Sequence, residues 1–77
     1  MMLCDLKIGE KAKITAINLN YKKKKRLIDL GLDVGVEIQK IRNAPLLSPI
    51  EFKVMNFFLS IRKNVAKKIM VVKIYDK

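Results

Sequence analysis

The sequence predicts a mostly β protein, a small antiparallel barrel of about five strands with one short α-helix and one or two single helical turns. The chain has 77 residues, which suffice for one domain spanning residues 1–77. Short stretches of alternating apolar and polar side chains, bounded by turn-forming residues, recur along it. Only one stretch carries a helix stop signal. Closing short strands into a barrel removes most of the exposed edges that a small sheet would leave.

The first residues predict a single helical turn that leads into the domain. Leu3, Leu6 and Ile8 are expected to point inward. Cys4 or Asp5 can cap the turn. Gly9 is expected to reverse the chain before the first strand.

The first strand is predicted at residues 12–18, AKITAIN. Ala12, Ile14 and Ala16 alternate with the side chains of the opposite face, so one face is expected to be buried. This strict alternation places Ile17 on the outer face.

The helix is predicted at residues 21–30, YKKKKRLIDL. Asn18 or Asn20 can cap its first turn, and Gly31 has the position at which glycine commonly ends a helix with positive φ. The lysines lie mostly in the first turns, where the helix dipole disfavours cations, so packing has to hold the helix. The residues expected to pack it are Leu27, Ile28 and Leu30.

The next strand is predicted from Val36 to Arg42, where Val36 and Ile38 alternate with polar residues. A loop with two prolines follows at residues 43–49, NAPLLSP. Proline cannot donate a hydrogen bond to a sheet, so this segment is not a central strand.

The last third of the chain predicts a hairpin and a closing strand. Residues 50–54 and 57–63 form the hairpin, and Asn56 is expected to accept the positive φ of its tight turn. A short turn at residues 64–66 then leads to a strand at residues 69–75.

The formal net charge is +10, from 17 basic and 7 acidic residues. Such charge favours an anionic partner, namely nucleic acid, an anionic membrane surface or an acidic protein face. A biased composition that raises the charge without a role is an equally open explanation. The segment 1–10 lacks the apolar run of a signal peptide, and no apolar run approaches the roughly 20 residues that cross a bilayer.

The side chains give no constellation for catalysis. The chain has no histidine and one cysteine, Cys4, so the usual general base is absent and the thiol lacks a histidine that would activate it. The three glycines form no phosphate-binding loop, and a metal site is not expected from these donors. The sequence therefore predicts no enzyme, no catalytic residue, no cofactor and no metal ligand.

Two kinds of residue are candidates for partner contact. One is the run of lysines on the helix, whose charge would tune the encounter with an acidic surface or the membrane. The other is exposed apolar side chains on the proline loop and hairpin, although a leucine of the loop can equally cover an open end of the barrel. The candidates are Lys22, Lys23, Lys24, Lys25, Leu46, Leu47 and Phe58.

The run RLIDLGLDVGVEIQKIRNAPLLSPIEFKV, residues 26–54, resembles the ferrous iron transport protein A (FeoA) family. The shared features are a basic residue before D-L-G-L, a glycine turn, an A-P-L loop that ends in Pro-Ile, a hairpin, and an arginine before a short turn with alanine. The matching residues include Arg26, Leu27, Asp29, Leu30, Gly31, Leu32, Gly35, Ile38, Ala44, Pro45, Leu46, Pro49, Ile50, Phe52, Val54, Leu59, Arg62, Ala66, Ile69 and Val71. The chain departs from the pattern at Val34, Leu47, Ser48 and Asn56.

The resemblance implies an SH3-like barrel and a cytoplasmic accessory of the ferrous iron permease FeoB, whose cytosolic part is a GTPase domain. It implies regulation by protein contact rather than iron binding, with recruitment to the inner face of the membrane as one form of that role. The alternative is a small basic SH3-like nucleic-acid-binding module, which is disfavoured because charge alone supports it. The oligomeric state, and any effect on GTP hydrolysis, stay open.

Overall fold

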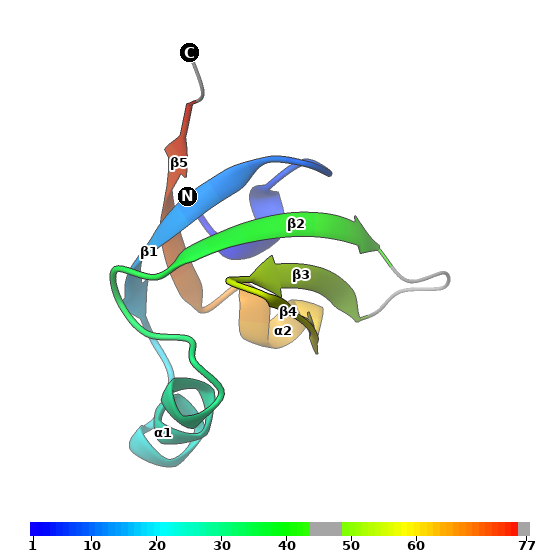
Figure 1. Ribbon diagram of the computed structural model, residues 1–77. Coiled ribbons are helices and arrows are strands. Elements are labelled where there is room, and N and C mark those ends of the chain that lie inside the picture. The colour runs from blue at the N-terminus through cyan, green and yellow to red at the C-terminus, as the bar shows by residue number, and fades with distance from the viewer. Residues whose placement is uncertain (44–48, 76–77) are drawn as a thin grey trace.

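The computed structural model describes residues 1–43 and 49–75 of the chain. Five antiparallel strands form one curved sheet in the order β4-β3-β2-β1-β5 (Figure 1). The elements are η1 (Leu3–Asp5), β1 (Lys11–Ile17), α1 (Tyr21–Asp29), β2 (Glu37–Asn43), β3 (Ile50–Val54), β4 (Phe57–Ile61), α2 (Lys63–Ala66) and β5 (Ile69–Ile74). The order of elements predicted from the sequence is therefore confirmed.

The core lies inside the curve of the sheet. Every second side chain of β3, of the first half of β1 and of the first half of β2 points inward. The turns η1 and α2 contact each other, and α2 links β4 and β5, which stand at the two ends of the sheet order. The buried apolar residues are Leu3, Leu6, Ala12, Ile14, Ile17, Leu32, Ile38, Ile50, Phe52, Val54, Ile61, Ala66, Ile69 and Val71.

The buried position of Ile17 differs from the expectation. The register between β1 and β5 shifts between Ile14 and Ala16. Such a bulge adds one residue and exchanges the faces of the side chains that follow it. Ile17 is therefore buried, and its predicted outward position is wrong.

Three details of the turns also differ. Ile8 is exposed, whereas Leu3 and Leu6 are buried as expected. The N-cap residue of the first turn is Met2, rather than Cys4 or Asp5, and its backbone N–H donates to Oδ2 of Asp5 at 3.1 Å. In the hairpin the positive φ of +53° falls on Met55, whereas the sequence predicted it at Asn56.

The turn between β3 and β4 explains that last difference. Val54 pairs with Phe57, so Met55 and Asn56 are the two central residues of the loop. One class of tight hairpin turn requires positive φ at its first central position. Met55 is at that first position and Asn56 is at the second, so the positive φ falls on Met55.

Candidate functional site

The lysine-rich helix α1 is fixed at both ends by local hydrogen bonds. At its start, Oδ1 of Asn20 accepts a hydrogen bond from the backbone N–H of Lys23 at 2.9 Å. At its end, the N–H of Leu32 donates to the carbonyl of Leu27 and that of Gly31 to the carbonyl of Ile28, both at 2.9 Å. This pair of bonds is a Schellman motif, and it needs positive φ at Gly31, which has φ +97°. The predicted cap and glycine stop are confirmed.

α1 stands off the sheet at one end of the molecule (Figure 1). None of its residues is buried. Leu27 is half-buried against the core, and Leu32, just past the helix, is fully buried. Together these two leucines anchor the helix, because the Schellman turn brings Leu32 back toward Leu27.

The predicted packing face of α1 is therefore mostly wrong. Ile28 is 39% exposed and Leu30 53% exposed. An apolar stripe on a helix shows which side prefers burial, but burial also needs a neighbour that covers that side. Here only Leu27 reaches the core, so α1 presents apolar side chains and cations together on its surface.

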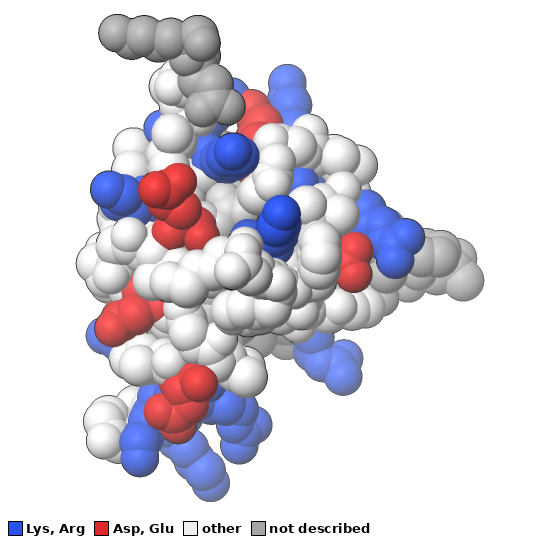
Figure 2. Space-filling model, viewed as in Figure 1, with Lys and Arg blue, Asp and Glu red and all other residues white. Residues whose placement is uncertain are grey.

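The lysines of α1 form the most concentrated positive surface in the view of Figure 2. In Figure 2 the Lys and Arg side chains gather at the lower end, over α1, with one acidic group among them. Lys22, Lys23 and Lys25 are exposed, and Lys24 is half-buried. The ion pairs among the described residues lie elsewhere, between Arg42 and Glu51 and between Glu10 and Lys73.

The hairpin supplies a second, apolar surface. Phe58 is 58% exposed, in agreement with its predicted outward orientation, and the ammonium of Lys53 lies 5.8 Å from its ring centroid. Phe57 was not singled out from the sequence, yet its ring lies against the end of α1. A Cβ at Gly31 would lie 3.3 Å from Cζ of Phe57. Leu46 and Leu47 lie outside the described residues.

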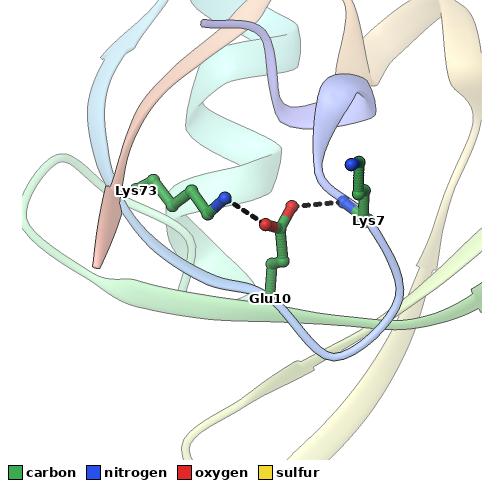
Figure 3. Close-up of polar contacts among 3 residues, drawn as sticks. All are labelled: Lys7, Glu10 and Lys73. Atoms are coloured by element: carbon green, nitrogen blue, oxygen red, sulfur yellow. Dashed lines mark hydrogen bonds and ion pairs between the residues drawn. The ribbon is translucent and has the colours of Figure 1, made fainter. Parts of the chain in front are cut away.

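A polar cluster joins the start of β1 to the end of β5 (Figure 3). Oε1 of Glu10 accepts a hydrogen bond from the backbone N–H of Lys7 at 2.7 Å, and Oε2 pairs with the ammonium of Lys73. Lys73 also lies over the ring of Tyr75, at 5.1 Å from its centroid. No sequence pattern predicted the ion pair of this cluster, because Glu10 and Lys73 meet only through the β1–β5 register.

Glu10 gives the protein a pH-dependent contribution to stability. Its pKa lies below the ordinary value of 4.5, first because Lys73 donates to the carboxylate and second because the Lys7 backbone does. A group with a lowered folded pKa stabilises above its unfolded pKa and loses that effect as the pH falls through the folded pKa. The same pair raises the pKa of Lys73, and that contribution is lost as the pH rises through the raised value.

We expect Glu10→Gln to lower the midpoint of urea unfolding slightly at neutral pH and not at all at a pH below the lowered pKa of Glu10. Both the carboxylic acid and the amide are neutral there, so the ion pair is absent from both proteins. Urea titrations at a series of pH values measure the difference. A difference that stays constant down to acid pH would contradict an electrostatic role, and Glu51→Gln at the more exposed pair with Arg42 is the matched control.

Three further features of the described residues concern metal binding, the single thiol and the crossing of a membrane. Within residues 1–43 and 49–75, no group of three or more His, Cys, Asp or Glu is placed to hold a metal ion. Cys4 is a free, half-buried thiol whose Sγ lies 3.9 Å from Oδ1 of Asp5. Among the same residues, no helix combines the length and the apolar character that crossing a bilayer requires.

Comparison with known proteins decides the family. The FeoA domain model matches residues 1–73. The chain belongs to the FeoA family. It is also 31% identical over 71 residues to an Fe(2+) transport protein A/Fe(2+) transporter FeoB fusion protein of Porphyromonas gingivalis. That match covers 92% of this chain and 8% of the fusion protein, so the chain corresponds to a small part of that polypeptide.

Solved FeoA structures confirm the fold. The solution structure of FeoA from Chlorobium tepidum is 36% identical, with a TM-score of 0.92 over 100% of this chain and 74% of that one. The crystal structure of Stenotrophomonas maltophilia FeoA, described as a procaryotic SH3 domain protein, has a TM-score of 0.76 at 24% identity, over 94% of this chain and 89% of that one. The predicted SH3-like, mostly β architecture is thus confirmed.

Proposed function

We propose that this FeoA protein is an accessory of ferrous iron transport that acts by contact with the cytosolic GTPase part of FeoB. The observation that supports this most strongly is the fusion protein of Porphyromonas gingivalis, in which a FeoA-like segment and an FeoB transporter form one polypeptide. Joining two modules in one chain raises the concentration of each near the other to about the millimolar range. Such a fusion is useful when the two modules work on each other.

The surface of the chain suits this role. Phe58 and its neighbour Phe57 are exposed on β4, and aromatic side chains are favoured at the centres of protein interfaces. The lysines of α1 would speed the encounter with a negatively charged surface rather than set the final affinity. We keep Leu46 and Leu47 as proposed contacts on the sequence argument alone.

The role requires no chemistry from the chain itself. FeoA would act on the cytoplasmic side, where the GTPase part of FeoB lies, and would change the behaviour of the permease without binding iron. Nucleic-acid binding is the weaker alternative, since it rests on the net charge of +10 and on no further feature.

Cells that lack this FeoA but retain FeoB test the role. We expect the rate of ferrous iron uptake to fall on deletion and to recover when the wild-type chain is supplied. The variant Phe52→Ala, which removes the central core side chain, is the control that should not restore uptake. Unchanged uptake at unchanged FeoB abundance would contradict the proposal.

A further inference from the structure

One face of α1 carries apolar and cationic side chains together. Tyr21, Lys24, Lys25 and Ile28 follow the spacing i, i+3, i+4, i+7, which places them on one face of a helix. Tyr21 is 80% exposed, and Ile28 lies two turns from it on the same side. The two lysines lie between the apolar pair, so the face has apolar ends and a cationic middle.

The remaining cations lie beside this face or behind it. At about 100° per residue, Lys22 borders the face, whereas Lys23 and Arg26 project from the opposite side of the helix. All three are exposed, and Asp29 is the only acidic residue of α1. Placing lysines in the first turns works against the helix dipole, so the stability of α1 does not explain where they are. The helix also protrudes from the body of the protein (Figure 1), which leaves this face open to a large partner.

The geometry points to an anionic lipid bilayer as the occupant: we propose that α1 lies along the surface of such a membrane. Tyr21 and Ile28 would enter the headgroup region, while the lysine stems lie along it with their ammonium groups at the phosphates. Tyrosine is favoured at this depth because its ring is apolar and its hydroxyl polar. Nine residues make a helix about 14 Å long, which suits the plane of the interface rather than a crossing of the bilayer.

Two features favour lipid over an acidic protein or nucleic acid. First, the cations are four lysines and one arginine, and lysine acts as a point charge, whereas bidentate recognition of carboxylate or phosphate uses arginine. Second, α1 is convex and stands off the sheet, so a protein partner would need a groove, whereas a bilayer deforms around it. This inference does not depend on the proposed contact with FeoB, because lipid vesicles contain no permease.

Sedimentation with lipid vesicles tests the proposal. The purified chain is mixed with vesicles of phosphatidylcholine and phosphatidylglycerol, or of phosphatidylcholine alone, at low and moderate salt. We expect partition onto the anionic vesicles only, decreasing with salt. Each cation near an anionic surface raises partition about fivefold, so Lys22→Gln/Lys24→Gln/Lys25→Gln should lower it about 100-fold. Glutamine has nearly the helix propensity of lysine, so α1 should persist.

A matched variant distinguishes the effect of the α1 lysines on partition from the effect of the net charge. Lys63→Gln/Lys67→Gln/Lys68→Gln changes the same total charge at and just after α2 and should leave partition nearly unchanged. Equal losses for the two triple variants would overturn the role of α1.

The apolar part of the proposal has its own control. We expect Tyr21→Ser/Ile28→Ser to lower partition about tenfold and to make the remainder more sensitive to salt. Tyr75→Ser/Val72→Ser removes a similar exposed pair within and just after β5 and should have little effect. No preference of the wild-type chain for anionic vesicles would overturn the proposal. So would binding of α1 to the FeoB GTPase part or to an oligonucleotide in place of vesicles.

Discussion

Phe52→Ala should destabilise the protein severely. Phe52 is the largest fully buried side chain, with no exposed surface, at the centre of β3. Removing a buried phenylalanine costs about 3–5 kcal/mol. The whole domain is stabilised by about 4–12 kcal/mol, on a scale of 0.05–0.15 kcal/mol per residue. The variant therefore loses a large share of the total, and its Tm should fall by more than about 12 °C.

Phe58→Ala is the matched control for this prediction, because the same side chain is removed from the exposed face of the adjacent strand. Its cost should stay below about 1 kcal/mol, which includes the lost interaction with Lys53. Thermal unfolding followed by circular dichroism measures both variants. Similar losses in the two would show that the faces of the hairpin are assigned wrongly.

Leu32→Ala should destabilise the protein by about 2–5 kcal/mol, whereas Ile28→Ala should change its stability by less than about 0.5 kcal/mol. Leu32 is fully buried and anchors α1 through the Schellman turn. Ile28 is partly exposed on the helix, and alanine is the better helix former, which offsets the small loss of burial.

Urea unfolding gives the two free energies, and hydrogen exchange shows whether the amides of α1 lose protection in Leu32→Ala. A large cost for Ile28→Ala would contradict the exposed position of that side chain. It would restore the interpretation of Leu27, Ile28 and Leu30 as one packing face.

Sequence patterns predicted the elements of this fold because local rules determine them. Alternation located β3 and the first half of β1, Asn20 and Gly31 marked the two ends of α1, and the two-residue loop marked the hairpin. The family pattern then supplied the SH3-like class, which alternation alone cannot distinguish from other small barrels.

The features that the sequence did not reveal depend on contacts between distant segments. The bulge that buries Ile17 is a property of the β1–β5 register, and the Glu10–Lys73 pair depends on the same register. The exposure of Ile28 depends on the absence of a covering element above α1 in the described chain. An apolar stripe therefore predicted packing where the structure presents a surface.

The candidate site was predicted in part. The exposure of Phe58 and of three of the lysines agrees with the sequence, while their role in binding is a proposal. Phe57 was not among the contacts predicted from the sequence, because the alternation of β4 places its side chain on the face opposite Phe58. Only its proximity to Gly31 joins it to α1.

The most direct test of the central claim is an NMR titration of the isotopically labelled chain with the cytosolic GTPase part of FeoB. Spectra are recorded at low and moderate salt, with a nucleic-acid oligomer in a parallel titration. We expect localised shift changes at the proposed contacts Phe58, Leu46 and Leu47, and these should persist at moderate salt. Reversing Lys22 to Lys25 should slow the association at low salt and leave the fold intact. No shifts with the GTPase part, together with strong salt-sensitive shifts from the oligomer, would contradict the account and favour a nucleic-acid-binding module.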